Sequence, residues 1–137
     1  MKCGSLLLLL ALVACVASSQ ARPALGDFVG MWFSVDFDNN VDSGRYLIIK
    51  KSTDNLAVQY KEASEAFGGI LSYSLEQRGF VGVFKGLGTV VIRKIKSTAG
   101  LSLDQITEFE DIPLGFFQKR DVLENTLGLK LPNPDAK

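Results

Sequence analysis

Apolar residues alternate with polar ones in short runs from Phe28 to Phe117, and turn residues separate the runs. Alternation with a period of two is the pattern of a strand with one buried face. The runs give about eight strand candidates spaced roughly ten residues apart, which is typical of an antiparallel sandwich or barrel. The connections are too short for helical crossovers, which excludes a parallel α/β sheet. A meander of this length exposes two edges unless it closes on itself, so a closed barrel is favoured.

The pattern changes near the C-terminus. Residues 122–127 follow helical spacing, Asp121 is the expected N-cap, and Gly128 with Pro132 beyond it suits a helix end. The predicted fold class is therefore all-β: an antiparallel up-and-down β-barrel of about eight strands with a short C-terminal helix.

The N-terminal segment has the three parts of a secretory signal peptide. Lys2 supplies the charged start, residues 6–16 form an unbroken apolar run, and small residues follow it. This run of 11 residues is too short for a membrane-spanning helix, which needs about 20 apolar residues. Cleavage is expected after Ser19 or after Ala21. The predicted boundaries are residues 1–19 for the signal peptide and 20–137 for one secreted, extracellular domain without an integral membrane segment.

Composition excludes several kinds of chemistry. The chain has no histidine, and both cysteines, Cys3 and Cys15, lie in the predicted signal peptide. The mature protein would therefore lack a histidine-dependent catalytic triad, a disulfide and a Cys or His metal site. The 15 basic and 15 acidic residues balance, which argues against nucleic acid as a partner. Glu108 and Glu110 share one strand face without a facing carboxylate, so we expect neither an enzyme nor a cofactor.

The predicted first strand contains the motif Gly30-x-Trp32, and the predicted last strand ends at Arg120 just before the helix. A Gly-x-Trp at the start of a small secreted barrel resembles the lipocalins and the wider calycin superfamily. The resemblance implies that the glycine allows close approach of the first strand and that the tryptophan plugs the closed end. It also implies that the arginine packs over the tryptophan ring. Gly30, Trp32 and Arg120 are thus the expected barrel-closing residues.

Parts of the sequence depart from the lipocalin pattern. Lipocalins are usually longer and most carry a disulfide, and their middle Thr-Asp-Tyr motif has only Thr107-Glu108-Phe109 as its nearest analogue. Fatty-acid-binding proteins share a Phe-x-Gly-x-Trp opening. Their helix-turn-helix after the first strand has no counterpart between Asp36 and Tyr46, so the lipocalin-like barrel is favoured. The alternative is an unrelated closed barrel in which Trp32 is simply a core residue.

The resemblance implies that the barrel interior holds a small hydrophobic molecule. An eight-stranded barrel is either filled by side chains or wide enough for one small ligand. The more apolar face of each strand is expected to line the interior, where tyrosine hydroxyls would orient a polar ligand end. The expected ligand-binding residues are Val58, Tyr60, Leu71, Tyr73, Leu75, Phe84, Val90, Ile92, Leu103 and Phe109. The first functional hypothesis is therefore a secreted binding or carrier protein that transports a hydrophobic ligand.

A second functional hypothesis comes from an acidic stretch. Asp36, Asp38 and Asn40 have the spacing that opens a calcium loop. A helix-loop-helix site would need glycine where Val41 stands and glutamate where Leu47 stands, so any metal site here would be a weak one. The other interpretation of this stretch is a solvated loop. The alternative function is an extracellular structural or matrix protein that contacts calcium and transports no ligand.

Overall fold

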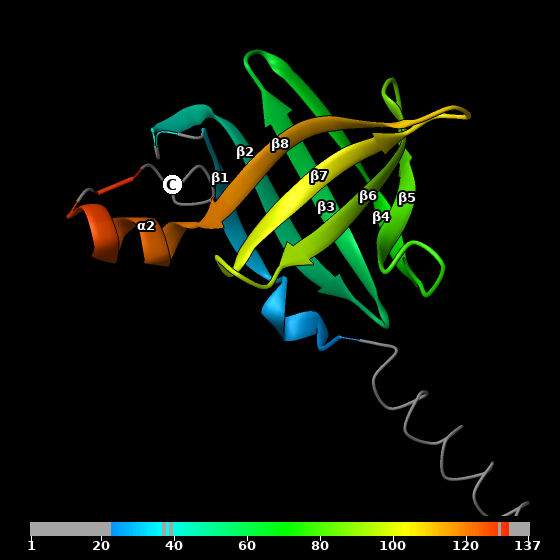
Figure 1. Ribbon diagram of the computed structural model, residues 1–137, viewed down its shortest axis with the longest axis horizontal. Coiled ribbons are helices and arrows are strands. Elements are labelled where there is room, and N and C mark those ends of the chain that lie inside the picture. The colour runs from blue at the N-terminus through cyan, green and yellow to red at the C-terminus, as the bar shows by residue number, and fades with distance from the viewer. Residues whose placement is uncertain (1–22, 37, 39, 129, 132–137) are drawn as a thin grey trace, which may run out of the picture.

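The computed structural model describes residues 23–36, 38, 40–128 and 130–131, and it is a closed antiparallel barrel (Figure 1). The strands are β1 (Gly30–Val35), β2 (Val41–Ser52), β3 (Asn55–Glu62), β4 (Glu65–Ser74), β5 (Gly79–Phe84), β6 (Gly88–Ile95), β7 (Gly100–Ile106) and β8 (Asp111–Lys119). A short 3-10 helix, η1 (Leu25–Asp27), precedes β1, and helix α2 (Arg120–Leu127) follows β8. The predicted fold class is confirmed, whereas the predicted signal peptide lies outside the described residues.

Pairing between the first and last strands closes the barrel. Every strand pairs with its sequence neighbour, and Trp32, Phe33 and Ser34 of β1 also pair with residues 117–119 of β8. Both edges of β1 and of β8 are thus hydrogen-bonded, which removes the exposed edges that an open meander of eight strands would leave. The alternating apolar pattern leads to closure because each strand has one face to bury and the sheet buries these faces against one another.

The inward-facing side chains form one continuous core. Its members are Phe28, Trp32, Leu47, Ile49, Leu56, Val58, Tyr60, Leu71, Phe80, Phe84, Val90, Ile92, Leu101, Leu103 and Phe117, each at most 4% exposed. Aromatic rings fill much of this space, and the Phe28 and Phe80 rings meet edge to face with centroids 4.9 Å apart. Phe28 directly follows η1, so this short helix carries a ring into one end of the barrel.

A second core lies outside the barrel, beneath α2. Phe33 faces away from the interior yet is fully buried, because Leu123 of α2 and Leu131 cover it. The helix ends as predicted at Gly128, a left-handed residue whose N–H donates to the Glu124 carbonyl over 2.9 Å. Its predicted start is wrong, because the N-cap is Lys119. Asp121 lies inside the first turn, where its negative charge interacts favourably with the positive end of the helix dipole. Among the described residues, no helix has the length and apolar content needed to cross a membrane.

The glycine-rich run at residues 79–88 serves strand packing. A Cβ atom on Gly82 would overlap the carbonyl oxygen of Ile70 on the neighbouring strand β4. Glycine is therefore required because β4 and β5 approach each other too closely for a side chain at this position. The run is followed by strand β6, whereas a phosphate-binding loop of the Gly-Lys-Ser/Thr type is followed by a helix.

Substitutions at two leucines of the same β-hairpin test the inward and outward assignments. We expect Leu71→Ala to lower the free energy of unfolding by about 2–5 kcal/mol, because Leu71 is fully buried and its loss leaves a cavity. Leu75→Ala, at a side chain that is 65% exposed, should change it by less than about 0.5 kcal/mol. Chemical denaturation of both variants measures the difference. Equal destabilisation would contradict the observed register.

Candidate functional site

Most of the residues predicted to bind a ligand lie in the barrel interior. Those in the buried core are Val58, Tyr60, Leu71, Phe84, Val90, Ile92 and Leu103. Tyr73 is partly buried and packs against this core. A space large enough for a water molecule would leave part of its lining accessible, but these core side chains are only 0–4% exposed. The interior is therefore a packed core along these residues, and their role in ligand binding stays a prediction.

Two of the predicted interior residues lie outside the barrel. Leu75 is 65% exposed and Phe109 is 91% exposed, so the prediction that they face the interior is wrong. The physical reason is that β4 ends at Ser74 and β7 ends at Ile106. Both residues consequently lie in turns, where the alternation of a strand no longer decides which way a side chain faces.

A polar cluster occupies the end of the barrel opposite η1. The Arg45 guanidinium donates to the Tyr60 hydroxyl over 3.0 Å and to the backbone carbonyl of Leu114. The Tyr60 hydroxyl in turn donates to the Glu62 carboxylate over 3.2 Å, and the Phe67 ring stacks on Tyr60 with centroids 6.0 Å apart. Burial raises the pKa of Tyr60, which outweighs the lowering by the Arg45 hydrogen bond. The hydroxyl expected to orient a ligand is therefore already engaged by protein groups.

Arg45 was not among the residues predicted from the sequence, although the sequence contains a signal for it. Arg45 precedes Leu47 and Ile49 at a spacing of two, so the alternation that buries these two residues also directs Arg45 inward. An arginine in phase with core residues indicates a charged group placed near the end of a barrel. Such a position requires hydrogen-bond acceptors, which Tyr60 and the Leu114 carbonyl provide.

The end near η1 contains the Gly-x-Trp motif. The Trp32 indole N–H donates to the Phe28 carbonyl over 2.9 Å, and the ring lies in the core. The Lys119 ammonium lies 5.8 Å from the Trp32 ring centroid. Gly30 has a φ of +141°, and a Cβ there would lie 2.9 Å from Cε of Lys119. Glycine is thus needed for its backbone angle, whereas the flexible lysine chain could move away from an added Cβ.

Arg120 does not occupy the position over the tryptophan ring that the resemblance implied. Lys119 is the register partner of Trp32 across the β1–β8 pairing and supplies the cation there. The next residue, Arg120, begins α2, and its Nε lies 3.4 Å from Oε1 of Glu124 one turn along the helix. The cation over the ring is therefore Lys119, because β8 ends at Lys119, one residue before the predicted boundary, and Arg120 already belongs to the helix.

The three residues proposed as a weak metal site lie in a hydrogen-bonded turn. The Asp36 carboxylate accepts hydrogen bonds from the backbone N–H of Asp38 over 2.9 Å and of Asn40 over 2.8 Å. The Asn40 side-chain amide adds a third bond over 3.3 Å. Within the described part of the chain, no group of three or more His, Cys, Asp or Glu side chains is placed to hold a metal ion. The Asp36 oxygens therefore stabilise the β1–β2 connection, and calcium binding stays a prediction.

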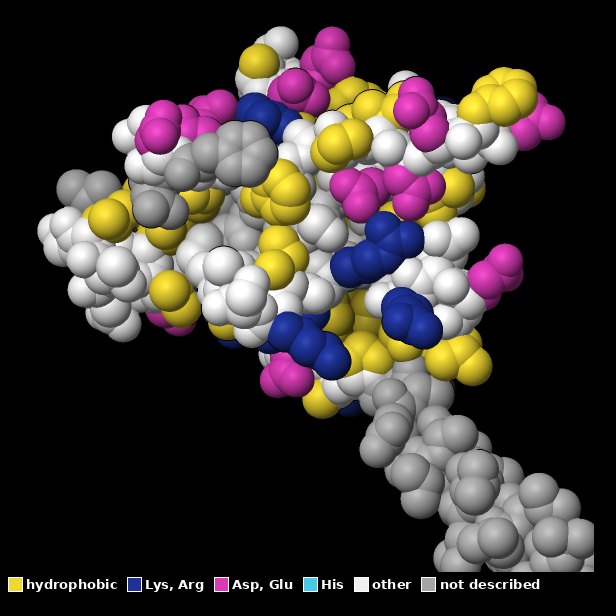
Figure 2. All heavy atoms as spheres, viewed as in Figure 1, with side chains coloured by type: hydrophobic (Ala, Val, Ile, Leu, Met, Phe, Trp, Pro, Cys, Tyr) yellow, Lys and Arg dark blue, Asp and Glu magenta, His cyan; other side chains and the backbone are white. Residues whose placement is uncertain are grey.

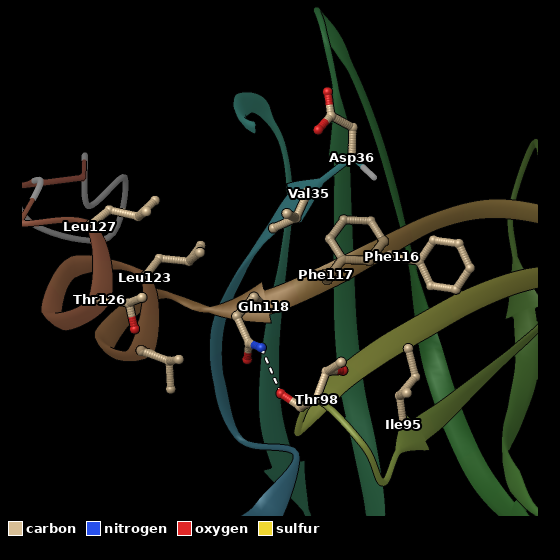
Figure 3. Close-up of a pocket in the computed structure, with 11 residues that line it drawn as sticks. Val35, Asp36, Ile95, Thr98, Phe116, Phe117, Gln118, Leu123, Thr126 and Leu127 are labelled. Carbon is tan, nitrogen blue, oxygen red and sulfur yellow. Dashed lines mark hydrogen bonds between the residues drawn. The ribbon is translucent and has the colours of Figure 1, made fainter. Parts of the chain in front are cut away.

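An apolar groove of about 480 Å³ lies outside the barrel, against α2 (Figure 3). We call it the α2 groove. Its apolar lining residues come from β1, the end of β6, β8 and the helix: Val35, Ile95, Phe116, Phe117, Val122, Leu123 and Leu127. Its polar lining residues are Asp36, Thr98, Gln118 and Thr126. Phe116, Val122 and Leu127 are each more than 40% exposed, so apolar surface is accessible from solvent.

Two polar residues of the α2 groove, Gln118 and Asp36, already form hydrogen bonds with the protein itself. The Gln118 amide donates to the Thr98 carbonyl over 2.9 Å and accepts from the Lys119 backbone N–H over 3.0 Å. The hydrogen bond from the backbone N–H of Asn40 is the main reason that the pKa of Asp36 lies below its usual value, and Asp36 is therefore ionised at neutral pH. The groove thus has apolar walls and a negatively charged residue, Asp36, at its rim, whose carboxylate points away from the groove toward its own turn (Figure 3). No sequence pattern pointed to it, because it forms where α2 folds back beside β1 and β8.

Substitutions at Lys119 and Arg120 test which cation contacts the tryptophan. Trp32 is the only tryptophan of the chain, so intrinsic fluorescence reports on this site alone. We expect Lys119→Met to shift the emission of Trp32 and to cost about 0.5–1 kcal/mol of stability. Arg120→Met should leave the emission unchanged. A shift with Arg120→Met and none with Lys119→Met would show that Arg120, and not Lys119, contacts the Trp32 ring.

A pH titration tests the Asp36 turn. Its folded-state pKa is lowered, first by the Asn40 backbone hydrogen bond. The turn's contribution to stability should therefore be complete above the unfolded-state pKa and be lost as pH falls through the lower folded-state pKa. Carboxyl NMR of the folded protein measures this pKa directly. Titration of Asp36 at or above the usual aspartate value would contradict the hydrogen-bonded turn.

Comparisons with known proteins add no family assignment. No protein-family model matches the chain, and neither does any curated protein or solved structure. The closed eight-stranded up-and-down barrel is nevertheless compatible with a lipocalin- or calycin-like fold.

Proposed function

We propose that the protein is a secreted, lipocalin-like binding protein that carries a small hydrophobic molecule, and that this molecule lies in the α2 groove. The observation that carries the proposal is the size and lining of the groove. Its volume of about 480 Å³ falls within the range of about 300–1,000 Å³ that small-molecule sites occupy. The barrel interior, where the family would place a ligand, is filled by the protein's own side chains. Secretion rests on the N-terminal segment of the sequence.

The lining of the α2 groove also selects among hydrophobic ligands. Apolar walls from Phe116, Val122 and Leu127 favour burial of a hydrocarbon body, at about 25 cal/mol per Å² removed from water. The ionised Asp36 at the rim disfavours a second negative charge nearby, so a neutral end group is preferred to a carboxylate. The favoured ligand is therefore an apolar molecule with a hydroxyl or amide end rather than a fatty acid anion.

A matched ligand pair tests both the site and its selectivity. Retinol and retinoic acid share the same hydrocarbon body and differ at the end group. We expect retinol to bind the chain secreted from a eukaryotic host more tightly, by at least tenfold, because the negative charge of Asp36 at the rim disfavours a carboxylate. Native mass spectrometry of the secreted protein, before and after solvent extraction, shows any bound cargo. Fluorescence titration then gives the two affinities.

Two variants locate the binding site. Val122→Gln combined with Leu127→Gln makes the α2 groove polar and should weaken retinol binding at least tenfold. Val83→Gln replaces an exposed apolar side chain on β5, outside the groove, and should leave binding unchanged. Equal affinities of the three proteins would show that the ligand lies elsewhere.

The second candidate function is an extracellular structural or matrix protein. The filled barrel core favours it, since a scaffold needs a solid interior rather than a cavity. An apo mass before extraction, together with no retinol or retinoic acid binding, would reject the carrier proposal and leave this alternative.

A further inference from the structure

The turn between β7 and β8 holds an aromatic side chain in solvent. Phe109 is 91% exposed, the highest exposure of any large apolar residue described. Hydrogen bonds lock the turn around it: the Thr107 N–H donates to the Glu110 carbonyl over 3.0 Å, and the Glu110 N–H donates to the Thr107 hydroxyl over 3.1 Å. The Thr107 hydroxyl also donates to that carbonyl over 2.6 Å. These bonds hold the backbone of the turn, and from it the Phe109 ring projects into solvent.

Acidic side chains surround this ring. Glu108 and Glu110 flank Phe109 in sequence, Asp111 follows, and all three are exposed. Asp111 lies 3.6 Å from the Arg93 guanidinium, whereas the two glutamates form no ion pair among the described residues. We call residues 108–110 the acidic knob. Figure 1 shows that the β7–β8 hairpin projects from the barrel, and Figure 2 shows acidic side chains gathered at its end.

A cleft of complementary character lies at the other end of the barrel. This basal cleft has a volume of about 320 Å³ and lies between the start of β1, the middle of β2 and the start of α2. Val29, Met31 and Ile48 contribute apolar surface. Its charged lining consists of three cations and one carboxylate: Lys50, Lys119, Arg120 and Asp121. Lys50 is exposed and forms no ion pair within the described part of the chain.

Strand β8 sets the separation of the two features. It begins at Asp111, beside the acidic knob, and ends at Lys119, in the basal cleft. Its 9 residues at about 3.4 Å each place the two sites about 30 Å apart. The knob of one molecule therefore cannot reach its own cleft.

We propose that the acidic knob of one copy docks into the basal cleft of a second copy of this chain, joining molecules head to tail. The Phe109 ring would bury its surface against the apolar wall, and Glu108 and Glu110 would face Lys50 and the cations at α2. Charge selects this cleft over the α2 groove, whose charged lining residue is the acidic Asp36. Because knob and cleft are different surfaces, the contact is heterologous and extends into chains or closes into a ring.

Self-association of the full chain, secreted from a eukaryotic host, tests the proposal. The contact is small and charged, so it should be weak and should weaken further with salt. We expect the average mass, measured by sedimentation or light scattering, to rise with protein concentration at low salt. Phe109→Ser and Lys50→Glu should each stay monomeric, while Leu75→Ser, at another exposed turn residue, should associate like the parent.

Mixing the two deficient variants distinguishes a head-to-tail contact from any other. The Phe109→Ser protein keeps an intact cleft, and the Lys50→Glu protein keeps an intact knob. Together they should form a one-to-one complex that grows no further, because each remaining site is defective. Trp32 emission confirms that both variants are folded. A parent protein that is monomeric at every concentration, association that survives Phe109→Ser, or a mixture that stays monomeric would each overturn the proposal.

Discussion

The pairing of β1 with β8 is the constraint on which the rest of the structure depends. It closes the sheet, and closure at eight strands leaves an interior of a size that side chains can fill. The same seam places Lys119 opposite Trp32, so the cation over the ring follows from register. It also places α2, which directly follows β8, beside the outer face of β1. There Phe33 and Leu123 form the second core, and the α2 groove opens next to them.

Because the interior is packed, both proposed binding sites lie on the outside of the barrel. Each end of the core has its own closure: η1 and Phe28 at one, the Arg45 and Tyr60 cluster at the other. Ligand entry into the interior would require breaking hydrogen bonds of a half-buried arginine and displacing aromatic rings. The outer surface carries accessible apolar side chains in the α2 groove and at Phe109. The filled core thus acts as a rigid scaffold that presents both sites.

Much of the fold was predictable because alternation and turn residues report directly on strands and their ends. The strand order, the closed barrel and the helix end at Gly128 all follow from local patterns. Errors arose where a local pattern continued past the true end of an element. The alternation runs on through Leu75 and Phe109, yet the strands stop before them, and the helix starts before Asp121. Arg45 was overlooked because its role depends on hydrogen-bond acceptors in β3 and β8, which lie far away in the chain.

The amino-acid sequence by itself determined the number of strands, their antiparallel order and the face that each buries, because these depend on periodicity within a few residues. It also determined the absence of histidine chemistry, which is a matter of composition. Tertiary structure alone decided that the interior is full, that Lys119 rather than Arg120 contacts Trp32, and that a groove and a cleft exist outside the barrel. These features depend on volumes and distances between strands, which arise only when distant segments pack together.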